Sequence, residues 1–227
     1  MFFLPFDYTF LLLIPALILA LYAQGRVTNT YALLARKKAQ AGLSGWQVAQ
    51  RLLDTLGLHM KVEEIPGSLT DHYDPGRGVL RLSSSVARGA SIADYGIVAH
   101  EIGHVMQKKE GYSFFAFRSA LVPVAGFGSQ LALPLFFIGL IFAIRPLMDL
   151  GIIFFSLAVL FQLVTLPVEY DASRKAMILL ERTGLLGLDE KPLAQKMLNA
   201  AALTYVAATA VAALQLLRLF LLRESRD

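Results

Sequence analysis

The chain has 227 residues, of which 56% are hydrophobic and 17% are charged, and its formal net charge is +4. This composition is typical of a membrane protein, and the scattered basic residues argue against a nucleic-acid partner. The chain has no cysteine, which excludes disulfides, cysteine-ligated zinc and thiol nucleophiles.

Four segments are long and apolar enough to cross a bilayer, which takes about 20 residues. The first, residues 1–25, lacks the basic start and the small-residue cleavage site of a signal peptide, so we expect an uncleaved anchor. The second and third form a hairpin over residues 119–168. The last span covers residues 198–222 and precedes a short polar tail at 223–227. The lipid bilayer is therefore the first partner that the sequence predicts.

The basic residues indicate which side of the membrane each connecting segment occupies. Four of them lie between Arg26 and Lys38, directly after the first span. The positive-inside rule therefore places residues 26–118 in the cytoplasm, and the membrane hairpin returns the chain to that side at residues 169–197.

The first cytoplasmic segment begins with a predicted amphipathic helix at residues 43–56, which starts with a capping box of Ser44 and Gln47. Trp46 in this helix is either a core residue or an anchor at the membrane interface, and we favour the core. A weak strand pattern follows at residues 60–65.

Two more strand patterns flank the turn Asp74-Pro75-Gly76-Arg77-Gly78. We expect a small hairpin or sheet packed on the next helix, with an edge strand able to hold an extended peptide. His72, at the end of the first of these strands, has two interpretations. It is either a turn residue with local hydrogen bonds or a contact to substrate or oxyanion near a metal.

A predicted helix at residues 92–107 follows a capping pattern at Ser91 and carries the sequence His100-Glu101-Ile102-Gly103-His104. Side chains four residues apart lie on one face of a helix, so both histidines can bind one metal ion. Glu101 is placed to take a proton from a coordinated water that zinc has made acidic. Gly103 is unfavourable inside a helix and indicates a close approach by another segment.

A third ligand is expected from the second cytoplasmic segment, because catalytic zinc has three protein ligands and an open position. Glu169 is our candidate, although it also fits a helix-start carboxylate after Pro167. Asp171 would point about 200° around the helix from Glu169, and Asp149 belongs to the outward turn of the hairpin, so both are weaker candidates. Arg174 is able to pair with a carboxylate or to steady an oxyanion.

Longer motifs make the chain resemble, almost end to end, the YugP-type family of bacterial membrane zinc metallopeptidases. They are Leu69-Thr70-Asp71-His72-Tyr73-Asp74-Pro75, the H-E-I-G-H helix, Arg118-Ser119-Ala120-Leu121-Val122-Pro123-Val124, and residues 162–174 with Leu166-Pro167-Val168-Glu169. These motifs are far more specific than H-E-x-x-H alone.

More distantly, the chain is similar to the clan of HtpX and the CAAX prenyl endopeptidases. In that clan H-E-x-x-H precedes a membrane hairpin and a glutamate that is followed four residues on by an aspartate. The similarity implies His100 and His104 as metal ligands, Glu101 as base and Glu169 as third ligand. Ser173 stands where the aspartate is expected. Since the aspartate supports a ligand histidine in the clan, a hydroxyl would do so more weakly.

The expected fold is mainly α: a polytopic helical membrane protein with about four transmembrane helices and a small α+β, zincin-like cytoplasmic domain. The expected function is that of a membrane-embedded zinc metalloendopeptidase in a bacterial plasma membrane. It would use one Zn²⁺ and Glu101 to hydrolyse peptides or membrane proteins at the cytoplasmic face.

Two other functions fit parts of the sequence. A non-catalytic binding or assembly protein with a structural metal site would keep the histidines, but it would have no need of Glu101 as a base. A transporter or channel would carry ionisable residues inside its spans, and these spans have almost none.

Overall fold

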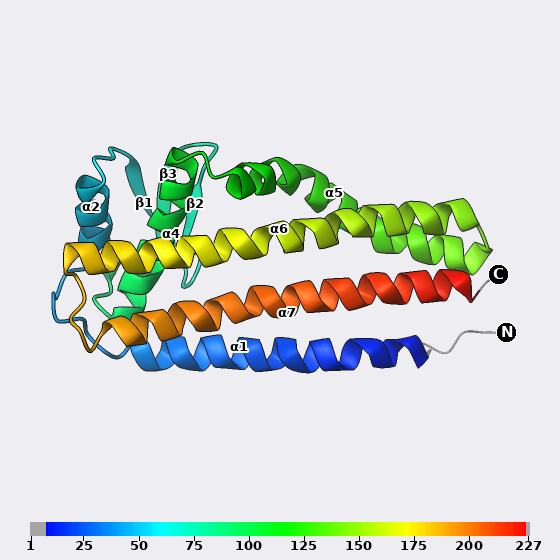
Figure 1. The fold of residues 1–227 in the computed structure, drawn as a ribbon, viewed down its shortest axis with the longest axis horizontal. Helices are drawn as coiled ribbons and strands as arrows, with labels where there is room; N and C mark the ends of the chain where they lie inside the picture. The colour runs from blue at the N-terminus through cyan, green and yellow to red at the C-terminus, as the bar shows by residue number, and fades with distance from the viewer. Residues whose placement is uncertain (1–7, 226–227) are drawn as a thin grey trace. The chain divides into compact units, whose positions relative to one another are not determined.

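A computed structural model of the chain describes residues 8–225 (Figure 1). It confirms the predicted class, a mainly helical protein with a small sheet. The ends of the predicted first span and of the polar tail, residues 1–7 and 226–227, lie outside the described residues. The elements in chain order are η1 (Tyr8–Leu13), α1 (Ile14–Leu34), α2 (Gly45–Thr55), β1 (Lys61–Ile65), β2 (His72–Asp74), β3 (Val79–Ser83), α3 (Ser84–Arg88), α4 (Ile92–Lys109), α5 (Ser113–Phe142), α6 (Arg145–Thr183) and α7 (Lys191–Glu224).

The chain divides into two compact units, which we describe separately. The helical unit contains the chain up to Gln24, Ala116–Leu166 and the chain from Leu203 on. The α/β unit contains Gly25–Phe115 and Pro167–Ala202. Pro167, which removes one backbone hydrogen bond inside α6, is the first residue of the second part of the α/β unit.

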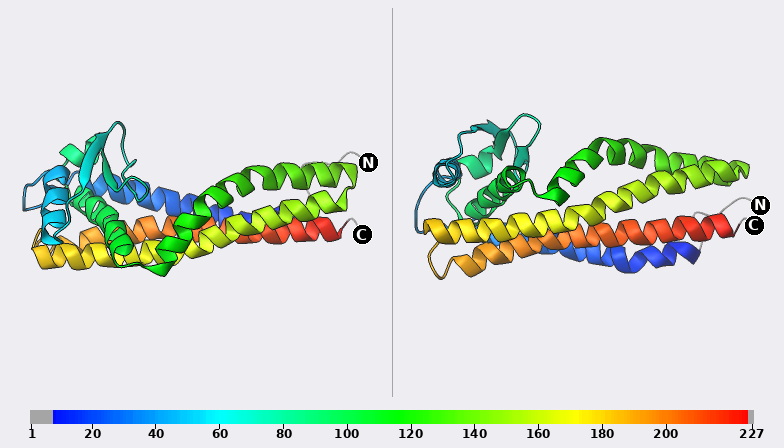
Figure 2. Two further views of the ribbon diagram at one scale, coloured as in Figure 1. Left: turned by 90° about the horizontal axis from the view of Figure 1, so that it is seen from above. Right: turned by 45° about the horizontal axis from the view of Figure 1, so that its top comes forward.

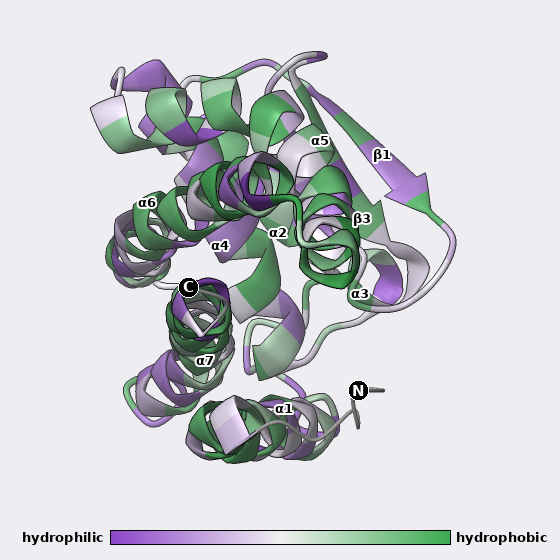
Figure 3. Ribbon diagram, turned by 90° about the vertical axis from the view of Figure 1, so that its right-hand side faces the viewer, coloured by the Kyte–Doolittle hydropathy of each residue, from purple (hydrophilic) through white to green (hydrophobic). Residues whose placement is uncertain are grey.

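The long helices confirm the four predicted candidates for membrane spans. Tyr8–Leu34, Ser113–Phe142, Arg145–Thr183 and Lys191–Glu224 are each long and apolar enough to cross a bilayer, by length and composition. Figure 3 views these helices end-on and shows hydrophobic residues on them. All four extend beyond the predicted spans: α6, for example, continues through Glu169 to Thr183, and α7 begins at Lys191.

The core of the helical unit is built from three of these helices. Phe136 of α5 packs with Met148 and Ile152 of α6, and with Leu219 and Leu222 of α7. This cluster is purely apolar. The hydrophobic pattern of the spans is therefore sufficient to explain it.

In the α/β unit, α2 starts as predicted, with the capping box of Ser44 and Gln47. The predicted hairpin is formed by β2 and β3, and β1 adds to it in parallel, which gives the strand order β1-β3-β2. Asp71 stabilises the entry to the hairpin, since its carboxylate accepts hydrogen bonds from the backbone N–H and the hydroxyl of Ser83 (2.7 and 2.9 Å).

Helix α4 is the centre of the α/β unit. The sheet packs on it through β2 and β3, as two further views show (Figure 2). Tyr95, Val98 and Ile102 of α4 are completely buried in the main core of the unit, and the Tyr95 hydroxyl donates to the carbonyl oxygen of Leu43 (2.9 Å). Because this helix is so firmly packed, side chains on its remaining face are held in fixed positions.

Candidate metal centre

The two histidines of the motif lie one turn apart on α4. The helix begins with the predicted capping box, in which Ser91 and Asp94 each accept a hydrogen bond from the other's backbone N–H. The ring centroids of His100 and His104 are 4.8 Å apart, with the rings nearly perpendicular. The H-E-x-x-H spacing therefore places both imidazoles on one face, as the sequence predicts.

Glu169 reaches this face from α6. The side chain is only 2% exposed and lies well inside a helix that begins at Arg145, so the interpretation as a helix-start carboxylate is wrong. Gly103 explains how α6 comes so near, because a Cβ atom there would lie 2.5 Å from the carbonyl oxygen of Ala172. The missing side chain allows the backbones of α4 and α6 to touch.

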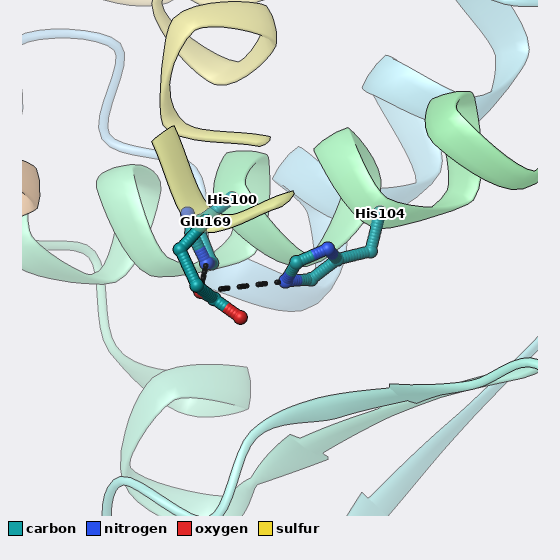
Figure 4. A group of neighbouring side chains, drawn as sticks. All are labelled: His100, His104 and Glu169. Atoms are coloured by element: carbon teal, nitrogen blue, oxygen red, sulfur yellow. Dashed lines mark hydrogen bonds and ion pairs between the residues drawn. The ribbon is translucent and has the colours of Figure 1, made fainter. Parts of the chain in front are cut away.

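The three side chains converge on one point (Figure 4). Oε2 of Glu169 lies 3.1 Å from Nε2 of His100 and 3.8 Å from Nε2 of His104, and one ligand atom from each residue lies within 4.8 Å of the others. Ligand atoms about 2.1 Å from a tetrahedral ion lie about 3.4 Å apart. Two neutral imidazoles and a carboxylate at these distances fit a zinc ion.

The other carboxylates considered for this role have different partners. Asp171 is bonded by Arg174, whose guanidinium donates at 2.5 Å, and by Gln107 at 3.0 Å. Asp149 lies in the helical unit, where it pairs with Arg223 at 2.9 Å. Neither belongs to the group formed by the histidines and Glu169.

Glu101 lies next to the first histidine in an environment that changes its acidity. Its Oε2 accepts a hydrogen bond of 3.0 Å from the backbone N–H of Tyr73 in β2. Loss of hydration raises the pKa of the Glu101 carboxyl to about 7, while His100 opposes this rise and the charge of Glu169 adds to it. A carboxylate with that pKa exchanges protons readily near neutral pH.

The imidazole nitrogens that face away from the group also have partners. Ser173 Oγ lies 3.2 Å from Nδ1 of His100, so the hydroxyl that replaces the expected aspartate does contact a ligand candidate. Gln107 Oε1 lies 3.0 Å from Nδ1 of His104. The ring of Phe115 covers His104, with centroids 5.9 Å apart.

The remaining residues predicted from the sequence have local partners. Nδ1 of the exposed His72 lies 2.8 Å from the carbonyl oxygen of Thr70, and its Nε2 lies 3.4 Å from Arg81. These contacts favour the interpretation as a locally hydrogen-bonded residue, although His72 is the first residue of β2 and does not lie in a turn. Arg174 pairs with Asp171, which is one of the two roles expected of it.

Comparison with known proteins agrees with this geometry. A family model described as "Putative neutral zinc metallopeptidase" matches residues 9–224. The chain belongs to this family. It is also 43% identical, over 208 residues, to a protein from Bacillus subtilis (strain 168) named "Putative membrane protease YugP", and the match covers 91% of this chain and 92% of that protein. No solved structure matches the chain.

Sequence reasoning missed Gln107 and the backbone of Tyr73. Gln107 carried a usable signal, because it lies three residues after His104 and so on the same helix face. The contact between Tyr73 and Glu101 had no such signal, since it depends on how the sheet packs on α4.

Proposed function

We propose that the chain is a membrane-embedded, zinc-dependent metalloendopeptidase that hydrolyses peptide bonds at the cytoplasmic face of a bacterial plasma membrane. The observation that supports this most strongly is the convergence of His100, His104 and Glu169 on one point directly beside Glu101. The family match and the membrane protease homologue point to the same class of reaction.

In this proposal the three converging side chains hold one Zn²⁺, and Glu101 moves the proton. Zinc bound there would supply Lewis acidity, which polarises the scissile carbonyl group and makes water a better nucleophile. Glu101 accepts the proton of the attacking water on its carboxylate and later donates it to the nitrogen of the leaving amine.

The edge strand β2 provides a way to align the substrate. It pairs with β3 on one side only, and its Tyr73 N–H on the other side is directed at Glu101. An extended peptide that pairs with this edge would run past the proposed base. We infer that loops or unfolded segments of membrane proteins are the substrates. An extended backbone is what such an edge recognises, and the four candidate membrane spans would bring the chain close to other membrane proteins.

Cleavage of casein by the detergent-purified chain with added zinc would test the proposal. We expect Glu101→Gln to lower the rate by about 10²–10⁴-fold, the usual contribution of a general base, while zinc stays bound. Glu64→Gln is a matched control, because Glu64 lies on β1 and pairs with Arg88.

Three other results would contradict the proposal. If both proteins bind zinc and neither cuts casein or a membrane-protein fragment, a structural metal site becomes the better explanation. If Glu101→Gln cuts as fast as the native chain, Glu101 is not the base. If neither protein retains zinc, the ligand set is wrong.

A further inference from the structure

One buried side chain beside the metal centre is not used by the proposed reaction. Gln107 is completely buried, although a primary amide has two N–H donors and a carbonyl oxygen to satisfy. It lies on α4, three residues after His104, and it reaches across to α6. A polar group is expensive to bury unless it forms hydrogen bonds, so its partners indicate its purpose.

The orientation of the Gln107 amide follows from its partners on α6. Its Nε2 donates to the carbonyl oxygen of Val168 at 2.7 Å and to Oδ2 of Asp171 at 3.0 Å. A backbone carbonyl can only accept, so the nitrogen must be on that side of the amide. The oxygen Oε1 is therefore the atom that faces His104, 3.0 Å from its Nδ1.

This orientation determines where the histidine carries its proton. Because Oε1 can only accept, Nδ1 of His104 must be the donor. In a neutral imidazole the other nitrogen, Nε2, then carries the lone pair that can bind a metal ion. Nε2 is the atom that faces Glu169.

We propose that Gln107 is a positioning residue of the metal centre, which fixes both the tautomer and the ring orientation of His104. This inference rests on the proposed zinc site and adds to it a residue that holds one of the ligands in place. Gln107 also bonds the residue directly before Glu169, so one side chain links a ligand on α4 to the segment that carries the ligand on α6.

On α6, ion pairs hold the partner of Gln107 in place. Asp171, which accepts from Gln107, also accepts from Arg174 at 2.5 Å and lies 3.8 Å from the ammonium group of Lys175. Lys175 in turn bonds Glu110, which caps the C-terminal end of α4. The partner of the Gln107 amide nitrogen is thus itself held in place, as positioning of a ligand requires.

The two ligand histidines are supported unequally. His100 has the hydroxyl of Ser173 at 3.2 Å, and a hydroxyl is able to rotate and either donate or accept. His104 has an oxygen that can only accept and cannot rotate away. We therefore expect the loss of Gln107 to weaken zinc binding more than the loss of Ser173.

The first test measures zinc affinity by competition with a chelator, without any substrate. Gln107→Met removes the hydrogen bonds and keeps the side-chain length, and we expect zinc to bind about 10- to 100-fold more weakly. Gln195→Met is the matched control, since this half-buried amide on α7 donates to Oδ1 of Asn199 at 2.8 Å and, within the part of the chain that the structure describes, forms no hydrogen bond to the histidines or Glu169. We expect its zinc affinity to be unchanged.

A second variant separates the acceptor role from simple bridging between the helices. Gln107→Glu keeps an oxygen opposite His104 but has no N–H to donate to Val168. If Gln107 acts by accepting the proton of Nδ1, this variant should bind zinc several-fold more tightly than Gln107→Met. A zinc affinity of Gln107→Met equal to that of the native chain would overturn the proposal.

The tautomer can be observed directly. The chain has four histidines, so ¹⁵N-histidine labelling gives a simple imidazole spectrum. In the metal-free native chain we expect the Nδ1-protonated tautomer of His104, which is lost in Gln107→Met and persists in Ser173→Ala. A native His104 that carries its proton on Nε2 would overturn the proposal. The proposed peptidase activity would not be affected, because it is tested separately through Glu101.

Discussion

The helical unit and the α/β unit differ in the charged groups that they bury. The central cluster of the helical unit is apolar, and its charged pair Asp149–Arg223 is about one-third to one-half exposed. The α/β unit buries Asp94, His104 and Glu169, each against a specific polar partner. Buried polar groups are costly unless they are paired, so the α/β unit depends on exact partners where the helical unit depends on hydrophobicity.

Removal of zinc should produce the largest difference in stability between the two units. Within the described residues, one group of metal-ligating side chains was found, and it lies in the α/β unit. A ligand at 1,000 times its Kd stabilises the folded state by about 4 kcal/mol, so a chelator should destabilise this unit by a similar amount. Trp46 is the single tryptophan and lies on α2, so its fluorescence reports on the α/β unit.

The chain is unfolded by denaturant with and without the chelator. The unfolding is followed by Trp46 fluorescence and, for comparison, by the far-ultraviolet circular dichroism of the long helices. We expect the denaturation midpoint seen by Trp46 to fall, and the midpoint of most of the helical signal to change much less. Equal shifts of both midpoints would mean that the two units unfold together and would remove the distinction between them.

The contact between α4 and α6 should be the next most sensitive feature. Gly103→Ala places a Cβ atom 2.5 Å from the carbonyl oxygen of Ala172, and backbone atoms cannot move aside as a flexible side chain would. Overpacking of this kind costs about 1–3 kcal/mol, and we expect weaker zinc binding as well, because Glu169 precedes Ala172 by less than one turn.

A second glycine of α4 serves as the control for this substitution. A Cβ atom on Gly96 would have no neighbour within 4 Å. Gly96→Ala should therefore stabilise the unit by up to about 1 kcal/mol through helix propensity alone. If both substitutions gave the same change in the Trp46 unfolding midpoint, the close approach of α6 would not be what Gly103 provides.

Loss of the buried capping interaction at the start of α4 should lower the stability by an intermediate amount. Asp94 accepts from the backbone N–H and the hydroxyl of Ser91, at 2.8 and 2.6 Å. Asp94→Ala should cost about 1–2 kcal/mol, the usual value for a lost cap, in denaturant unfolding followed by Trp46. Asp54→Ala, an exposed change on α2, should stay within about 0.5 kcal/mol of the native chain.

The pH dependence of Asp94 has a definite sign. Loss of hydration raises the pKa of this carboxyl above its ordinary value of 3.8, so the folded chain binds its proton more tightly than the unfolded chain. The contribution of Asp94 is therefore largest at low pH and falls as pH rises from 3.8 through the higher folded value. The stability difference between the native chain and Asp94→Ala should grow on acidification in this window, and a difference that shrinks would show that the ionised form is preferred.

The same contrast explains what could be predicted from the sequence. The spans, the two capping boxes and the H-E-x-x-H face follow from periodicity within about 20 residues, and these features were confirmed. The partners of Gln107 could not be predicted, because they join distant segments. The parallel pairing of β1 with β3 could not be predicted either, because a strand pattern does not specify its partner or its direction. Val168 lies 61 residues after Gln107, and no local pattern relates the two.

The smallest effect should come from the charged pair of the helical unit. Asp149→Asn removes the charge opposite Arg223, whose Nε donates to the carboxylate at 2.9 Å. Both side chains are partly exposed, and pairs of this kind contribute less than about 1 kcal/mol. We expect the helical signal in circular dichroism to unfold at nearly the native midpoint, and the Trp46 midpoint to remain unchanged. A loss as large as that of Asp94→Ala would mean that a polar contact is as important in the helical unit as in the α/β unit. The contrast between apolar and polar stabilisation would then fail.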